Sequence, residues 1–99
     1  MPKSSPTLYQ ALLKLKSEKE CIAFFRDLCT PAEITAMTER WKVALLLAED
    51  NFSYREIHAK TGVSLTTIGR VARFLTQETY QGYRLLLDRT HYENISEAS

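Results

Sequence analysis

The organisation of this chain follows from residues 53–75, which read SYREIHAKTGVSLTTIGRVARFL. Ser53 stands three residues before Glu56, the spacing of a capping box, and predicts the start of a short helix. Gly62 tolerates the left-handed backbone that ends such a helix, and Ser64 can cap a following one. The inward side of this second helix is predicted from apolar residues at intervals of three and four: Leu65, Ile68, Val71, Ala72 and Leu75. Two short helices joined by a tight glycine turn indicate a helix-turn-helix.

A long helix is predicted upstream, over residues 31–49. Its start combines a capping hydroxyl at Thr30, a proline at the first helical position and a glutamate at Glu33. We interpret Trp41 as an anchor of the core or of a dimer interface, and Asp50 and Asn51 as the end of the helix. The inward face is predicted to carry Ile34, Met37, Trp41, Leu45 and Ala48.

Two shorter helices are predicted before this one. Thr7 or Ser5 can cap the first, and Ser17 with Glu20 has capping-box spacing for the second. Their apolar faces are predicted to carry Leu8, Leu12 and Leu15 in the first helix, and Ile22, Phe25, Leu28 and Cys29 in the second. Both helices look too short to be stable without a partner surface.

The last predicted helix follows a looser stretch at residues 76–79. Its apolar positions are Tyr80, Tyr83, Leu86, Leu87 and Thr90. The polar segment 91–99 is predicted to be a frayed tail. The expected fold is therefore all-α, about six helices in one domain over residues 1–99, with the helix-turn-helix at about 53–75.

Length and composition set limits on the class of protein. The chain has 99 residues, of which 44% are hydrophobic, and this suits one globular domain whose core is marginal for a monomer. Cys21 and Cys29 lie about 12 Å apart by helical rise, too far for a disulfide, so we expect reduced thiols. Residues 1–6 lack the apolar segment of a signal peptide, and the longest apolar run, 43–48, is too short to cross a bilayer. We expect a soluble, cytoplasmic protein.

The net charge of +1 conceals a strong local pattern. Residues 51–75 carry four basic side chains against one acidic side chain, whereas residues 30–50 and 76–99 each carry two basic and four acidic side chains. This distribution excludes a protein that is basic over its whole surface, but it suits a single face that meets the phosphates of double-stranded DNA.

The second helix of the motif, at about 64–75, is the predicted recognition helix. Leu65 and Thr66 occupy the end that enters the major groove, where threonine can hydrogen-bond to a base and leucine can touch a thymine methyl group. Gly69, one turn later, has no side chain and permits close approach of the backbone. The full set predicted to contact DNA is Tyr54, Arg55, His58, Ser64, Leu65, Thr66, Gly69, Arg70 and Arg73.

Two other classes of function are compatible with parts of this sequence. A helical hairpin also occurs as a plain packing unit, and His58 stands where many such motifs have alanine, so a protein-interaction module that has lost operator binding is the alternative. Arg40 and Arg70 could hold a dianionic substrate between helices. However, the sequence has no paired-carboxylate, Ser–His–Asp or phosphate-loop motif and no metal-ligand spacing, so we expect neither an enzyme nor a metal site.

Several motifs keep an order and spacing that resembles the Trp repressor family, over about residues 28–90. They are Cys29-Thr30-Pro31-Ala32-Glu33 through Arg40, then Ser53-Tyr54-Arg55-Glu56-Ile57, Gly62 and Ser64-Leu65-Thr66-Thr67-Ile68-Gly69-Arg70. The ending Tyr80-Gln81-Gly82-Tyr83-Arg84-Leu85 is more similar to the repressor-like members found widely in bacteria than to the tryptophan-sensing repressor. The resemblance implies a six-helix fold, an intertwined homodimer and repression from a palindrome-like operator.

The same resemblance implies a candidate effector pocket at Thr30, Arg40, Thr67 and Arg70, which match positions that hold tryptophan in some members. Val71 and Phe74 replace a glycine and a serine of those members. Their larger side chains would project into the space for the indole and its ammonium group. We therefore expect that tryptophan is not a corepressor and that no cofactor is required.

Overall fold

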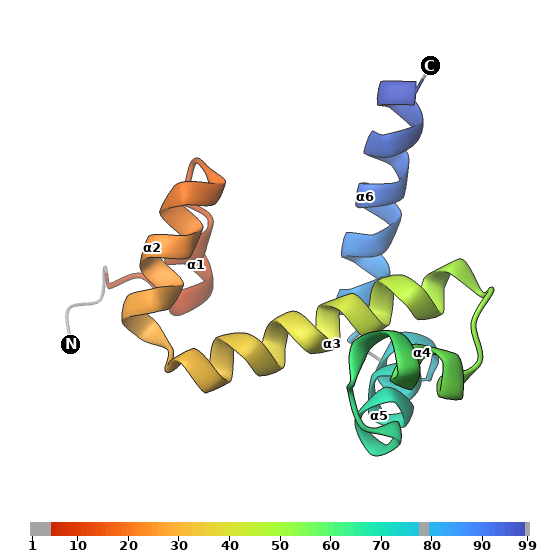
Figure 1. Cartoon of the computed structure of the whole chain (residues 1–99). Helices are drawn as coiled ribbons and strands as arrows, with labels where there is room; N and C mark the ends of the chain where they lie inside the picture. The colour runs from red at the N-terminus through yellow and green to blue at the C-terminus, as the bar shows by residue number, and fades with distance from the viewer. Residues whose placement is uncertain (1–4, 78–79, 99) are drawn as a thin grey trace. The chain divides into compact units, whose positions relative to one another are not determined.

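The computed structural model describes residues 5–77 and 80–98, with side chains up to residue 90. The described residues form helices and no strands (Figure 1). The helices are α1 (Leu8–Leu12), α2 (Glu18–Leu28), α3 (Pro31–Glu49), α4 (Tyr54–Thr61), α5 (Leu65–Thr76) and α6 (Gly82–Ala98). The chain divides into two compact units, residues 1–35 and 36–99. The six-helix, all-α prediction is confirmed.

Local hydrogen bonds define the helices of the first unit. Thr7 caps α1, because its hydroxyl accepts the Gln10 N–H and the Gln10 side chain accepts the Thr7 N–H in return. The Ser17 hydroxyl accepts the Glu20 N–H at the start of α2, while the Glu20 carboxylate accepts the N–H of Lys16. Helix α1 ends at Leu12, so the prediction that Leu15 lies on it is wrong. Its end tightens into i to i+3 bonds instead.

The first unit has no buried side chain among its described residues. Leu13 is 86% exposed, and Ile22 and Leu28 are about half exposed. The rings of Phe24 and Phe25 pack edge to face with their centres 5.8 Å apart. Cys21 and Cys29 are both free thiols, as the sequence predicted. These helices are well capped, but they enclose no core of their own.

Helix α3 begins with the predicted capping box. The Thr30 hydroxyl accepts the Glu33 N–H, and the Glu33 carboxylate accepts the Thr30 N–H. The inward face was predicted correctly at Trp41, which packs against the core, but wrongly further along, because the buried residues of α3 are Val43 and Ala44, whereas Leu45 is 36% exposed. Residues 43–48 are apolar on every side of the helix, so their spacing cannot select the buried face.

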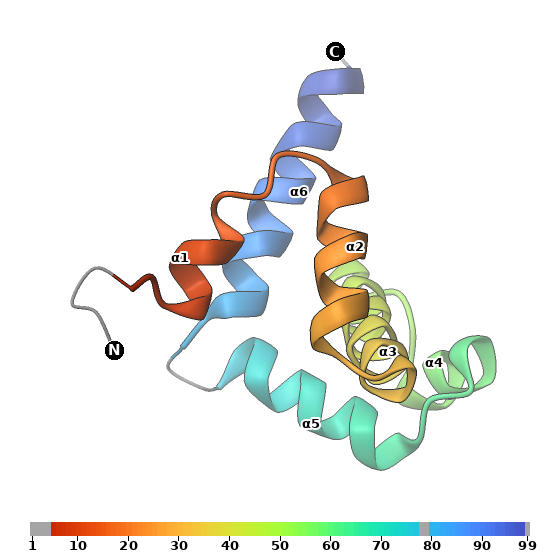
Figure 2. The same ribbon diagram turned by 90° about the vertical axis from the view of Figure 1, so that its left-hand side faces the viewer.

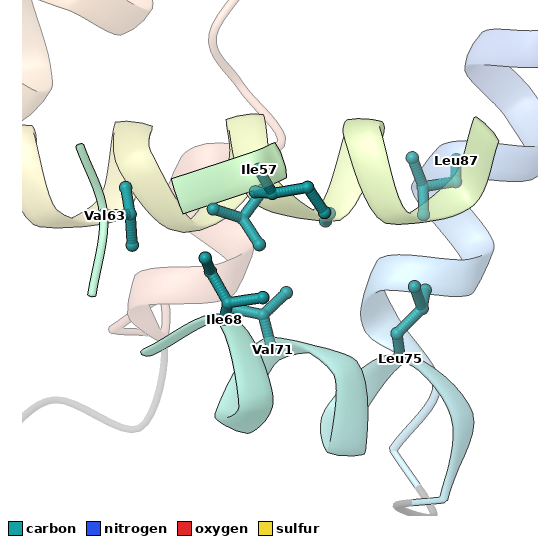
Figure 3. Packing of buried hydrophobic residues seen from close by; sticks show 8 residues of the cluster. Ile57, Val63, Ile68, Val71, Leu75 and Leu87 are labelled. Atoms are coloured by element: carbon teal, nitrogen blue, oxygen red, sulfur yellow. The ribbon is translucent and has the colours of Figure 1, made fainter. Parts of the chain in front are cut away.

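The core lies in the second unit and joins α3 to α4, α5 and α6. Figure 3 shows Ile57 of α4 and Val63 of the following turn packed over α5, and Leu75 of α5 beside Leu87 of α6. Trp41, Leu46, Leu47, Phe52 and Tyr83 pack around this cluster, so the core role predicted for Trp41 is supported. On α5, Ile68, Val71 and Leu75 are buried as predicted and Ala72 is half-buried. The exception is Leu65, which is 49% exposed and does not face the core.

The chain changes direction directly after α3 and directly before α6. Asp50 adopts a left-handed conformation (φ 57°) directly after α3, at the predicted end of that helix, and Gln81 does so before α6 (φ 61°). Part of the looser stretch 76–79 lies outside the described residues. The backbone of residues 91–98 belongs to α6, so the frayed tail stays a prediction about the chain in solution. No helix in the described part has the length and hydropathy needed to span a membrane.

Candidate nucleic-acid interface

Helices α4 and α5 form the helix-turn-helix that the sequence predicted (Figure 2). Ser53 and Glu56 make the capping box of α4, with N–H to oxygen distances of 2.9 and 3.1 Å. Gly62 ends α4 in the left-handed conformation (φ 76°), and its N–H donates to the His58 carbonyl at 2.8 Å. A Cβ atom at Gly62 would meet no other atom within 4 Å. The backbone torsion, rather than crowding, therefore requires glycine here.

The turn is held by the side chains of His58, which was predicted to contact DNA, and Thr61, for which no role was predicted. His58 Nδ1 lies 2.7 Å from the Val63 carbonyl oxygen, so this nitrogen carries the proton and donates it to the turn. The Thr61 hydroxyl donates to the Ile57 carbonyl and accepts the Val63 N–H. His58 therefore ties α4 to the turn, and only its Nε2 remains for an external group such as DNA.

Two hydroxyls at the start of α5, those of Ser64 and Thr67, already form hydrogen bonds within the motif. The Ser64 hydroxyl accepts the Thr67 N–H as the N-cap and donates to the Thr67 hydroxyl at 3.0 Å. Ser64 was predicted to contact DNA and Thr67 to line an effector pocket. In the structure both side chains take part in starting α5. Leu65 and Thr66 are exposed beside them.

Gly69 follows on the same side of α5, one turn after Leu65. A Cβ atom built there would find no neighbour within 4 Å. Packing within the chain thus gives no reason for glycine at this position, although glycine weakens a helix relative to alanine. The open position is consistent with the predicted close approach of a partner.

Arg70 and Arg73 share one aromatic side chain. Their guanidinium carbons lie 4.6 and 5.2 Å from the centre of the Phe74 ring. On the other side of the motif, the Lys60 ammonium lies 4.9 Å from the Phe52 ring. Neither aromatic partner was predicted from the sequence. The i to i+4 spacing of Arg70 and Phe74 was the available signal.

The electrostatics of the motif favour an anion. Arg55, Lys60, Arg70 and Arg73 are all exposed. The single acidic side chain, Glu56, accepts the Ser53 N–H, and this bond lowers the pKa of its carboxyl, with smaller help from the Ser53 hydroxyl and the Lys60 charge. Its negative charge is thus tied to the start of α4, and the four cations of the motif are exposed to solvent.

The residues of the implied effector pocket have other contacts in this structure. Thr30 belongs to the first unit and caps α3, while Arg70 lies against Phe74. Arg40 is half-buried on α3. Val71 is fully buried in the core of its own chain, so its side chain does not project into open space. A shared effector site for these residues stays a prediction.

A metal site has no support in the described part of the chain, where no three histidine, cysteine, aspartate or glutamate side chains cluster.

Tyr54, 45% exposed, and Arg55 lie in the first turn of α4, at the edge of the same basic region. The predicted DNA-contacting residues thus share one compact motif, with His58 and Ser64 holding its shape.

Comparisons with known proteins place this motif in a family. The family model described as Trp repressor protein matches residues 3–91. The uncharacterized protein YerC of Bacillus subtilis (strain 168) is 43% identical over 82 residues, which cover 83% of this chain and 77% of that protein. The crystal structure of a TrpR like protein from Eubacterium eligens ATCC 27750 superposes with a TM-score of 0.78 at 40% identity, covering 85% of this chain and 84% of the other.

Proposed function

The chain belongs to the Trp repressor family, and on that premise we propose that it is a homodimeric, sequence-specific DNA-binding transcriptional regulator that acts as a repressor. The observation that carries the proposal is the helix-turn-helix of α4 and α5. Its recognition helix presents an uncovered first turn beside four exposed cations. This combination suits a helix that enters the major groove while neighbouring cations meet the phosphates.

The two helices have different roles in the proposed complex. Helix α5 enters the major groove by its first turns, so Leu65, Thr66 and Gly69 lie nearest the base edges. Helix α4 crosses the backbone, where Tyr54 and Arg55 are placed for phosphates. Arg73, two turns along α5, reaches the phosphates that flank the groove. Phosphate contacts set the register, and the start of α5 reads the sequence.

A second copy of the chain completes the proposed molecule. The first unit has exposed apolar side chains and no buried residue in its described part, so its helices need a surface to cover them. A second copy supplies that surface and places a second recognition helix on a two-fold axis. Two such helices would meet major grooves about 34 Å apart on a palindrome-like site.

Tryptophan has no part in the proposed regulation. The centre of the Phe74 ring lies 4.6 Å from the Arg70 guanidinium carbon, and the ring fills space beside this side chain. The DNA affinity is expected to be the same with and without tryptophan. Micromolar tryptophan binding in a calorimetric titration would contradict this part of the proposal.

The test of the proposed function is selection of bound sequences from random duplex DNA, followed by mobility-shift titration at two salt concentrations. Arg55→Ala and Arg73→Ala are each expected to weaken binding. Because the proposed dimer loses two phosphate contacts with each substitution, the slope of log K against log salt should fall by about 1.8. Lys42→Ala, an exposed cation on α3 outside the motif, is the matched control and should change neither quantity.

Absence of binding at low salt would contradict DNA recognition. Co-purification of a stable protein partner by the same chain would then favour the interaction module that retains the fold without an operator.

A further inference from the structure

The start of the recognition helix lacks every side chain that reads a base through a pair of hydrogen bonds. Residues 64–69 are Ser, Leu, Thr, Thr, Ile and Gly, whereas paired readout requires arginine, lysine, asparagine or glutamine. Ile68 is buried in the core, and the hydroxyls of Ser64 and Thr67 bond to each other. Of the exposed side chains at this end of the helix, those of Leu65 and Thr66 take no part in the cap and are placed for the base edges.

The first cations of α5 come too late to replace such readers. Arg70 begins the second turn and Arg73 lies nearly a turn further, and the guanidinium groups of both lie against the Phe74 ring. Their positions beside the groove suit phosphates rather than the base pair at the tip of the helix. Guanine recognition by arginine is therefore not available at the start of α5.

Gly69 adds the geometric condition for short apolar contacts. It lies on the same side of the helix as Leu65 and Thr66, and the place of its absent Cβ atom is open. Without a side chain here, the first two turns can approach the floor of the groove closely. Close approach matters for an apolar contact because its energy falls steeply once the groups separate by an ångström.

We propose that this helix reads its operator through the C5-methyl groups of thymine. The Leu65 side chain and the Thr66 methyl group contact thymine methyls in the major groove, and Gly69 allows the backbone close enough for these contacts. The thymine methyl is the one apolar group that the base pairs display in this groove. The inference rests on the proposed function and names the chemistry by which that function becomes specific for sequence.

The test replaces thymine by deoxyuridine within the half-sites of the selected operator. This exchange removes only the methyl group and leaves base pairing and the hydrogen-bonding edge unchanged. Each contacted thymine so replaced should weaken binding about fourfold, the equivalent of one methyl group withdrawn from an apolar contact. The same exchange outside the half-sites is the control and should have no effect.

Variants of the protein connect the effect to these residues. In Leu65→Ala, the penalty for deoxyuridine at the partner position should disappear, because the group that contacts the methyl is gone. Gly69→Ala should weaken operator binding about tenfold, while its melting temperature rises by a few degrees because alanine favours the helix. If Gly69 had only a structural role, its replacement by alanine would not weaken operator binding while raising the melting temperature.

The outcomes separate this inference from the function on which it rests. A library with no enriched sequence overturns both. An enriched operator with half-sites of G·C pairs at the helix tip, or one bound equally well with uracil, overturns methyl recognition while DNA regulation stands. Loss of affinity on methyl removal that depends on Leu65 supports the inference.

Discussion

The two units of this chain reach helical structure by the same local means and differ in what holds the helices together. Each unit starts helices with capping boxes, at Thr7 and Thr30 in the first and at Ser53 in the second. The second unit then closes a core in which Ile57, Ile68 and others are fully buried, while the described part of the first buries nothing. Capping starts a helix, but burial of an apolar face stabilises it.

The difference suits a separate role for each unit in the proposed complex. The core of the second unit packs α4 against α5, the two helices that are proposed to contact DNA. The apolar side chains of the first unit stay exposed, because nothing in the described part of that unit covers them. This exposure is the basis for the proposed second copy. The following changes act on one side of this comparison at a time.

The largest effect is expected from the core of the second unit. Ile68→Ala removes a fully buried side chain and should lower the free energy of unfolding by about 2–5 kcal/mol, measured by denaturant titration. Leu65→Ala, three residues away and 49% exposed, is the matched control and should change stability by less than about 1 kcal/mol. Equal losses in the two variants would show that α5 does not pack as described.

The next effect concerns the exposed face of the first unit. The double variant Leu13→Ser with Ile22→Ser removes two apolar side chains from the proposed dimer contact. The dimer dissociation constant is expected to rise roughly a hundredfold in sedimentation equilibrium. Leu65→Ser removes a leucine that is 49% exposed, close to the 51% of Ile22, from the recognition helix and should leave the association unchanged. An unaltered dimer in the double variant would mean that the first unit is not the interface.

A smaller effect separates the two glycines of the helix-turn-helix. Gly62→Ala forces a side chain into the left-handed region and should lower stability by about 1–2 kcal/mol. Gly69→Ala lies within α5 with open space around it and should raise stability by up to about 1 kcal/mol. Thermal unfolding of both variants measures the contrast. A loss in Gly69→Ala would indicate a close contact that this geometry lacks.

The smallest effect is a dependence on pH, with one capping glutamate in each unit. Each glutamate carboxyl accepts hydrogen bonds from the backbone N–H and the hydroxyl of its capping residue. Thr30 bonds to Glu33 and Ser53 to Glu56, and these bonds lower the pKa of each carboxyl below the usual 4.5. The unfolded chain therefore takes up these protons first on acidification. The stabilisation is fully present above the usual glutamate pKa and is lost as the pH falls through the lowered folded values.

Denaturant titrations between pH 6 and pH 3 measure this dependence. Glu33→Gln and Glu56→Gln keep a capping side chain without the charge and should each flatten the acid limb of the stability curve. Glu49→Gln, at the far end of α3, is the control for the loss of one carboxylate. A curve of unchanged steepness in both capping variants would show that the boxes do not hold their charge in solution.

Features that depend on residues close together in the sequence were predicted, whereas features that depend on contacts between distant segments were not. The caps at Thr30 and Ser53 were predictable because donor and acceptor lie three residues apart. The buried side of α5 followed from its spacing, since its polar and apolar faces are distinct. On α3 the contact of Trp41 with the core was predicted, but the burial of Val43 and Ala44 was not. Apolar residues lie on every side of this part of the helix, and the residues that it packs against come from distant segments. Likewise, the bond from His58 to Val63 depends on how the turn folds back.

The amino-acid sequence contained the capped helix starts, the helix-turn-helix, the basic character of that motif and the family resemblance. Each of these depends on residues within a few positions of one another or on their order along the chain. Tertiary structure determined that Val43 and Ala44 are buried, that Phe74 lies against two arginines and that the described first unit has no core. Burial and stacking depend on which surfaces meet in space, and one-dimensional spacing does not contain that information.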